Sequence, residues 1–188
     1  QNILWKLEIP GEGHASPIIW KDQIFILTST PIEVEKKEQS IENEDGDTSF
    51  FGIPLEQFKQ AAQTGGRNRR GEAPNLNLKL AVICVNRTTG QVEWERIVRE
   101  TQPHEGTHNT ATWASYSPIT DGDYLYANFG SFGLYCLDLS GNVQWEIDLG
   151  NMRTRNSFGE GSSATLHNNT LIVNWDHEGD SFIVALDK

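Results

Sequence analysis

The sequence has few cysteines, few basic residues and no long hydrophobic run. Its 188 residues include two Cys, and 15 Lys and Arg stand against 26 Asp and Glu, a formal net charge of −11. Binding to a nucleic-acid backbone needs clustered Lys and Arg, so nucleic acid is not an expected partner. No apolar stretch approaches the roughly 18 residues of a membrane-spanning helix, so no transmembrane segment is expected. The Gly-x-Ser-x-Gly, P-loop and dinucleotide-binding signatures are also missing.

The N-terminus carries neither an initiator Met nor a signal peptide. Because secretory signal peptides are removed on export, we expect the natural N-terminus to lie upstream or to have been removed.

Three copies of one sequence pattern run through the chain. Each copy has a small-residue-plus-Ser run, a tight turn, two alternating strands of which the second ends in Asn or Asp, a Gly turn and a Trp. The copies begin at Ser16, Ser117 and Ser162, and the third stops at Asp187, before its Gly turn and Trp. A period of about 50 residues with about four strands per period is typical of a β-propeller. The sequence therefore predicts an all-β fold of four-stranded antiparallel blades.

The strands of each blade are named A to D from the axis outward, and the predicted order is D, ABCD, ABCD, ABC. The predicted ranges are 3–9 for the first D strand; 14–20, 23–29, 80–86 and 91–98; 112–120, 123–129, 133–138 and 142–148; and 161–167, 170–176 and 181–187. About three blades are fewer than the roughly four to eight of known propellers. We therefore expect residues 1–188 to be a partial domain of a larger propeller of about seven or eight blades, with the remaining blades in the same chain.

Residues 31–79 interrupt the first blade and do not follow the repeat. Residues 33–47 are strongly acidic, which predicts a solvated loop, and 65–71 are rich in Gly and Arg. Residues 54–63 place Leu55, Phe58 and Ala62 on one side, which predicts a short amphipathic helix. The favoured interpretation is a tolerated surface insertion, and the alternative is a lid or partner-docking arm.

The two cysteines occupy the same position in successive repeats. Cys84 and Cys136 are therefore predicted on equivalent strands of neighbouring blades. Stacked sheets lie about 10 Å apart, whereas a disulfide needs Cα atoms within roughly 7 Å. We expect two buried, unpaired thiols.

The predicted strand order sorts the connections onto two faces. The A–B and C–D connections are plain turns on one face, whereas the D–A and B–C loops of the other face hold the unusual stretches. A binding site is therefore expected on the D–A/B–C face, where Trp side chains offer stacking surfaces and Arg side chains offer donors for carboxylates, phosphates or sugar hydroxyls. The candidate ligand-binding residues there are His104, His108, Trp113, Arg153, Arg155, Asn156, Trp175, Asp176, His177 and Glu178.

Two loop clusters contain residue types that bind metals. They are His104, Glu105 and His108, and Asp176, His177 and Glu178 with Asp180. Neither has the spacing of a tetrahedral zinc site or an oxygen-rich calcium site, so hydrogen bonds to loop backbone are the favoured interpretation, with Asp176, His177 and Glu178 as weak metal candidates. For Arg153 and Arg155, salt bridges to Asp176 or Glu178 are an equally good explanation. No catalytic residue is predicted.

A recurrent turn ends the C strand and leads to the Trp of the D strand. Its residues are Asn86, Thr89, Gly90 and Trp94 in the first blade, Asp138, Gly141 and Trp145 in the second, and Asp187 in the third. These runs resemble the Trp-docking repeat of pyrroloquinoline-quinone (PQQ)-type propellers, a superfamily that includes quinoprotein alcohol dehydrogenases and the cofactor-free outer-membrane-assembly lipoprotein. The runs 14–18, 103–106 and 175–179 further resemble bacterial PQQ-binding-like propeller repeat proteins. The resemblance implies a structural docking role for the turn residues and an exported, periplasmic or extracellular location.

The resemblance to the dehydrogenases does not extend to their catalytic residues. Those enzymes share a vicinal Cys pair over the quinone, a Trp beneath it and a calcium ion with an Asp base, whereas Cys84 and Cys136 are far apart and no calcium or base position can be matched. We therefore expect a non-catalytic propeller module of an exported bacterial protein that binds a protein or glycan partner through the D–A/B–C face, without a cofactor. The alternative is a fragment of a PQQ-dependent oxidoreductase that uses PQQ with calcium.

Overall fold

The computed structural model describes residues 2–32, 49–50, 53–54 and 73–188. The chain divides into two units, Glu33–Arg69 and the rest, and in the smaller unit β3 (Ser49–Phe50) pairs with β4 (Ile53–Pro54). Pro54 thus ends a strand. The remainder of the helix predicted over 54–63, and the segments 33–47 and 65–71, lie outside the described residues.

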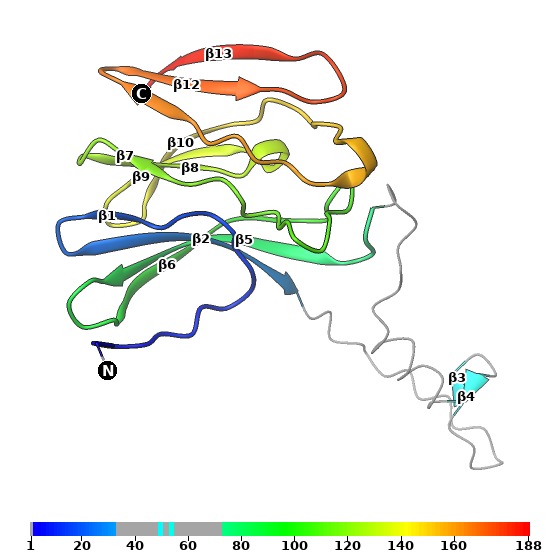
Figure 1. The fold of residues 1–188 in the computed structure, drawn as a ribbon, viewed down its shortest axis with the longest axis horizontal. Coiled ribbons are helices and arrows are strands. Elements are labelled where there is room, and N and C mark those ends of the chain that lie inside the picture. The colour runs from blue at the N-terminus through cyan, green and yellow to red at the C-terminus, as the bar shows by residue number, and fades with distance from the viewer. Residues whose placement is uncertain (1, 33–48, 51–52, 55–72) are drawn as a thin grey trace. The chain divides into compact units, whose positions relative to one another are not determined.

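The larger unit contains three antiparallel sheets (Figure 1). The first has the order β1-β2-β5-β6, the second β10-β9-β8-β7 and the third β11-β12-β13, so the predicted all-β class and the predicted grouping into four, four and three strands are confirmed. The strands are β1 (Ile18–Trp20), β2 (Gln23–Ile32), β5 (Asn77–Asn86), β6 (Val92–Thr101), β7 (Ile119–Thr120), β8 (Tyr124–Asn128), β9 (Leu134–Asp138), β10 (Val143–Ile147), β11 (Thr165–His167), β12 (Thr170–Trp175) and β13 (Phe182–Asp187). Two 3-10 turns, η1 (Gly130–Phe132) and η2 (Arg155–Ser157), lie in loops.

The pairing of β2 with β5 extends into the predicted insertion. The ladder runs from Gln23 opposite Asn86 to Ile32 opposite Asn77. Both ends of the range 31–79 therefore belong to paired strands, and the connection between the strands is shorter than the sequence pattern suggested.

The first strand of each sheet is shorter than predicted. The residues before β1 and β7 direct backbone groups to the next sheet: Ser16 N–H donates to Ser117 Oγ (3.1 Å), and Ser117 N–H donates to Ser163 Oγ (2.9 Å). Each N–H is thus satisfied by a side chain outside its own ladder, which ends the strand early. The recurrent serines therefore link successive sheets.

The strand predicted over residues 3–9 is not formed. The segment keeps its alternation, since Trp5, Leu7 and Ile9 are partly buried, whereas Ile3 and Leu4 are exposed. It runs along the side of the first sheet that faces away from the second (Figure 1). The first sheet already has its four strands, and a strand needs a paired edge for its backbone groups.

The second sheet is buried on both faces because successive side chains of a strand point in opposite directions. Leu125 and Leu137 join Phe25 and other side chains of the first sheet in one core cluster. Tyr126, Leu134 and Cys136 join Leu171, Val173 and Trp175 of the third sheet in the other. This two-sided burial explains why β8 and β9 are almost entirely apolar.

Two tryptophans make the same contact on successive sheets. Trp5 Nε1 donates to the carbonyl of Arg87 (3.0 Å), and Trp94 Nε1 donates to the equivalent carbonyl of Leu139 (3.1 Å). Each indole lies against the glycine of that turn: an added Cβ would lie 2.5 Å from the Trp5 ring at Gly90, and 2.8 Å from the Trp94 ring at Gly141. Larger residues at these two positions would displace the indole.

Side chains at the ends of the third strands order these turns. Asn86 Oδ1 accepts from the N–H groups of Thr88 and Thr89 (both 3.0 Å), and Asp138 Oδ1 accepts from those of Ser140 and Asn142. Hydrogen bonds from Asn142 hold the pKa of Asp138 below its ordinary value. These hydrogen bonds order the turns against which the indoles of Trp5 and Trp94 pack. In the third sheet the equivalent Asp187 accepts from Asn169 Nδ2, and Trp145 packs near Tyr126, with ring centroids 6.0 Å apart.

Cys84 and Cys136 are free and buried, as predicted. Loss of hydration, followed by the nearby charge of Glu93, raises the pKa of Cys84 to about 12, and burial raises that of Cys136 to about 11. Since the thiolate is the reactive form, we expect neither thiol to react with a disulfide reagent at about pH 8 in the native protein, and both to react in denaturant. Absorbance of the released chromophore measures this. A fast native reaction of one thiol would contradict its burial.

Among the described residues, no helix has the length and apolar character needed to cross a bilayer.

Candidate functional site

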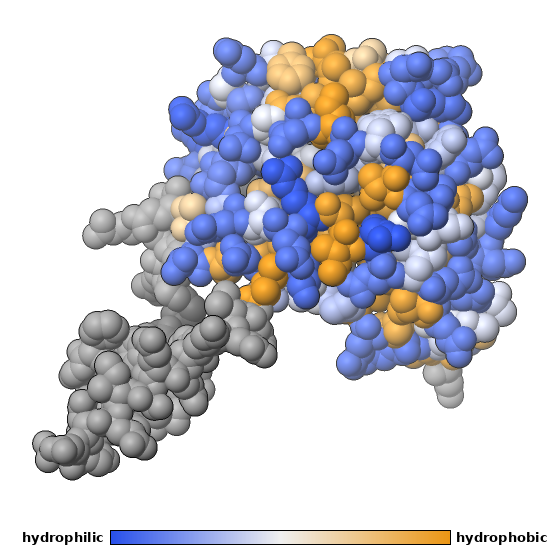
Figure 2. All heavy atoms as spheres, turned by 180° about the vertical axis from the view of Figure 1, so that it is seen from behind, coloured by the Kyte–Doolittle hydropathy of each residue, from blue (hydrophilic) through white to orange (hydrophobic). Residues whose placement is uncertain are grey.

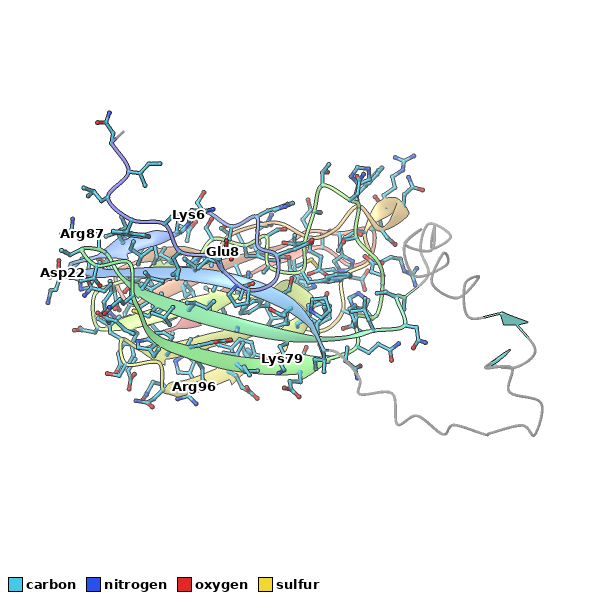
Figure 3. All side chains as sticks on the ribbon, turned by 90° about the horizontal axis from the view of Figure 1, so that it is seen from below. Lys6, Glu8, Asp22, Lys79, Arg87 and Arg96 are labelled. Atoms are coloured by element: carbon cyan, nitrogen blue, oxygen red, sulfur yellow. The ribbon has the colours of Figure 1, made fainter. Side chains whose placement is uncertain are left out.

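The long loops gather at one end of the three sheets (Figure 1). This loop-rich end carries the end of β2, the start of β5, η1, η2 and the β12–β13 connection, as the strand order predicted. The opposite end carries short turns, where Arg87 and Asp22 lie side by side and form an ion pair (3.1 Å; Figure 3).

A small hollow lies at the loop-rich end, between the loop after β6, η1 and the loop before β11. Its wall includes the polar side chains of His104, Glu105, Thr107, Thr112 and Glu160 and the aromatic side chains of Trp113, Tyr116, Phe129 and Phe132. The space open to the centre of a water molecule is about 10 Å³, which is room for about one water.

The carboxylate of Glu160 organises one wall of the hollow. It accepts hydrogen bonds from the Ser131 N–H (2.8 Å), the Ser131 hydroxyl and the Tyr116 hydroxyl (3.2 Å). Ser131 Oγ in turn accepts from the Met152 N–H (2.7 Å). Burial, together with the Glu160 charge, raises the pKa of Tyr116, so this hydroxyl stays a donor. The network joins η1 to three loops: the one before β7 through Tyr116, the one after β10 through Met152 and the one before β11 through Glu160.

Glu105 makes a second connection between loops. One of its carboxylate oxygens accepts from both the N–H (2.9 Å) and the hydroxyl (2.6 Å) of Thr154. The Thr154 hydroxyl also accepts from the Gly159 N–H (3.3 Å). Glu105 therefore fixes the η2 loop at the edge of the hollow.

His104 lies in the wall with one ring nitrogen satisfied. Its Nε2 lies 2.8 Å from the carbonyl of Met152 and must donate to it, because a carbonyl oxygen can only accept. In the neutral ring Nδ1 is then an acceptor, and it is buried with no partner among the described residues. The ring packs near Phe132, with centroids 5.7 Å apart.

An exposed aromatic pair lies beside the hollow. His108 and Phe158, the latter 50% exposed, meet edge to face with centroids 5.3 Å apart. Each is the chain neighbour of a hollow-lining residue, Thr107 and Gly159 respectively. Together with the partly buried Trp113, they give this end an aromatic surface.

The structure separates the other predicted site residues into two groups. Arg153, Arg155 and Asn156 are exposed, and Asn156 has a left-handed backbone (φ 54°). Trp175 was predicted as a surface stacking residue, and this is wrong: it is 2% exposed, lies in the core between the second and third sheets, and stacks on Phe182 (6.0 Å, 20°). An alternating strand places every second side chain inward, and Trp175 continues the inward series of Leu171 and Val173.

The β12–β13 loop uses its polar side chains for its own structure. His177 Nδ1 accepts from the backbone N–H groups of Arg153 (3.1 Å) and Gly179 (3.0 Å), and Asp176 accepts from the Ser181 hydroxyl (2.8 Å). The Glu178 N–H donates to the Arg153 carbonyl (2.9 Å). Within the described residues, neither Arg153 nor Arg155 forms an ion pair with Asp176 or Glu178. Backbone hydrogen bonds, rather than salt bridges, join the two loops.

Metal-ligating side chains do not converge in the described part of the chain, where no group of three His, Cys, Asp or Glu is placed to hold an ion. His104 and His108 face different partners, a backbone carbonyl and Thr110 Oγ1. Hydrogen bonds within and between the loops engage the side chains of His104, Glu105, His108, Asp176 and His177.

Sequence analysis did not predict Glu160 as a site residue, and it did not predict that Glu105 binds Thr154. Glu160 lies 29 residues after Ser131 and 44 after Tyr116. The only feature of Glu160 visible in the sequence is its position just before the recurrent Ser162–Ser163 run. Loop residues without periodicity carry no information on which distant side chain they meet.

The described residues define an all-β protein of stacked antiparallel sheets with one loop-rich end. The chain matches no protein-family model and no curated protein sequence.

Proposed function

We propose that the three sheets are blades of a larger β-propeller of the PQQ-like repeat class. The support is that the first sheet meets the second as the second meets the third, through the recurrent serine link from Ser16 to Ser117 and from Ser117 to Ser163. Nearest-neighbour contacts that repeat from unit to unit are the basis of repeat architectures. The Trp–Gly contacts of Trp5 and Trp94 add a second repeated interaction.

The outer face of the third sheet supports the presence of further blades. Ile183 occupies the sheet position of Leu134, yet Ile183 is 70% exposed and Leu134 is 2% exposed. Ala185 is likewise exposed where Cys136 is buried. Figure 2 shows hydrophobic side chains gathered at the end of the molecule formed by the third sheet. A further blade would cover this face, as the third sheet covers the second.

The function that this geometry supports best is that of a non-catalytic binding module, with a protein or glycan as partner. That the module belongs to an exported bacterial protein is proposed from the sequence resemblance alone. The observation that carries it is the exposed His108–Phe158 pair, which shares one end of the molecule with the exposed Arg153, Arg155 and Asn156. Exposed aromatics and Arg are the side chains enriched at binding surfaces. Most buried polar groups nearby form hydrogen bonds that join the loops, and the Ser131–Glu160 pair belongs to this network. Near the hollow, His104 Nδ1 and Asn128 Nδ2 are the buried side-chain atoms without a partner among the described residues.

Replacing Arg153, Arg155 and Phe158 together by alanine tests this function. We expect the wild-type protein to bind a component of a bacterial envelope-glycan array or an immobilised envelope-protein panel, and the triple variant to bind it at least tenfold more weakly, since about 1–2 kcal/mol of contact is lost. Lys6→Ala with Lys21→Ala is the matched control, because both lysines are exposed. Lys21 lies in the short β1–β2 turn at the opposite end, and Lys6 lies away from the loop-rich end (Figure 3). Equal loss in the control, or no loss in the triple variant, would refute binding through this end.

A further inference from the structure

We propose that the hollow at the loop-rich end recognises a primary ammonium group, specifically a lysine side chain of a protein partner. The inference rests on the proposed binding role of this end and names the chemistry of its ligand. It is carried by four properties of the hollow: its charge, its hydrogen-bonding groups, its size and its aromatic wall.

The charge of the wall is negative. Glu105 and Glu160 both line the hollow, and no Lys or Arg is among its lining residues. Within the described residues, both carboxylates are satisfied only by hydroxyl and backbone N–H donors and by no cation. Removing a carboxylate from water is costly unless it is paired, so a cation entering the hollow is favoured over a neutral or anionic group.

The hydrogen-bonding groups match a donor. His104 Nδ1 is a buried acceptor without a partner in the neutral ring, and leaving a buried acceptor unpaired is destabilising. The Tyr116 hydroxyl, a donor in the wall, is already used on Glu160. An ammonium group brings three donors and no acceptor, which is the complement of this arrangement.

The size of the hollow selects a slim ligand. Its room for about one water equals the volume of an ammonium head, but a sugar ring does not enter it. A lysine side chain carries its ammonium on a flexible four-carbon stem, which can follow the head into a narrow opening. This favours lysine over an amino sugar, whose amine is attached to a ring.

The aromatic wall suits both parts of a lysine side chain. Trp113, Tyr116, Phe129 and Phe132 line the hollow, and the exposed His108–Phe158 pair lies next to it. A cation within about 6 Å of an aromatic face is attracted to it, and methylenes pack against the same rings.

Titration of the protein with Nα-acetyl-lysine amide tests the proposal. Backbone amide shifts of Gly106, Thr107 and Gly159 report binding at the hollow, and Nε-acetylation of the probe removes its charge at nearly constant shape. We expect saturable shifts with the lysine probe and at least tenfold weaker binding of the acetylated one. Equal binding of the two probes would overturn the proposal, and stronger binding of glucosamine would overturn lysine in favour of an amino sugar.

Glu105→Gln is the diagnostic variant, because the amide oxygen can still accept from Thr154 while the charge is lost. We expect it to weaken binding of the lysine probe at least tenfold, whereas Glu178→Gln, at the same end but outside the hollow, leaves binding unchanged. Retention of thermal stability and of the amide spectrum shows that each variant is folded. Unchanged probe binding in Glu105→Gln overturns the proposal. If the lysine probe fails while the Arg153, Arg155 and Phe158 variant still loses its partner, the ammonium site is wrong and the binding role stands.

Discussion

Replacing Gly130 by alanine is expected to lower the free energy of unfolding by about 3–7 kcal/mol, because a backbone cost and a hydrogen-bonding cost add. Gly130 has a left-handed backbone (φ 57°), and a Cβ there would lie 1.9 Å from Glu160 Oε2 and 2.5 Å from the Tyr116 hydroxyl. The left-handed conformation alone costs a non-glycine residue about 1 kcal/mol. Displacing the carboxylate also leaves the Ser131 N–H and the Tyr116 hydroxyl without their partner in a buried place, at about 1–3 kcal/mol for each such group.

Gly150→Ala is the matched control for Gly130→Ala. Gly150 also has a left-handed backbone (φ 97°), but nothing lies within 4 Å of an added Cβ. It should therefore lose only the conformational part, about 1 kcal/mol. Denaturant unfolding measures both changes, and a Glu160→Ala background should reduce the cost at Gly130 toward that at Gly150. Equal costs at the two glycines in the wild-type background would contradict the Glu160 network.

Trp175→Ala is expected to destabilise the protein by about 3–5 kcal/mol, as truncation of a large buried aromatic does. The indole is 2% exposed, lies in the core cluster of the second and third sheets and stacks on Phe182. Its loss leaves a cavity between two sheets that the surrounding strands cannot close without breaking their ladders. The denaturant concentration at the unfolding midpoint should fall, while the slope of the unfolding free energy against denaturant concentration stays similar. An unchanged slope separates lost stability from a change in compactness.

Trp113→Ala provides the contrast within the same loop-rich half of the molecule. Trp113 is partly buried and lines the hollow, so its truncation should cost only roughly 1–2 kcal/mol. It should instead weaken binding of the lysine probe. A large stability loss at Trp113 together with a small one at Trp175 would reverse the assignment of the two residues to site and core.

The strand pattern was predictable because alternation and turn residues are local properties. The order and approximate ranges of β2, β5, β6, β8, β9, β10, β12 and β13 follow from the repeat. The turns at Gly90 and Gly141 were also predictable, because a Gly recurs at this place in the repeat. The structure gives the reason for the Gly: a docked indole leaves no room for a Cβ there. The loop-rich end follows from the same strand order, since it fixes which connections share an end.

Three features were predicted wrongly or not at all, each for a non-local reason. The inner strands are short because the backbone N–H groups of Ser16 and Ser117 bond to serine hydroxyls of the following sheet. Residues 3–9 alternate like a strand, but no edge of the described sheets pairs with them. Trp175 has the composition of a binding residue, but the inward phase of β12 buries it.

The sequence by itself determined the all-β class, the period, the grouping of strands and the end at which the long loops lie, because each depends on residues within one repeat. Only the tertiary structure decided which loop side chains are free and which are occupied. It brings Glu160 to Ser131 and Tyr116, Glu105 to Thr154, and His104 to Met152, over separations of 29 to 49 residues. The physical reason is that hydrogen bonds between loops depend on how whole sheets stack, and stacking is set by core packing that no single loop encodes.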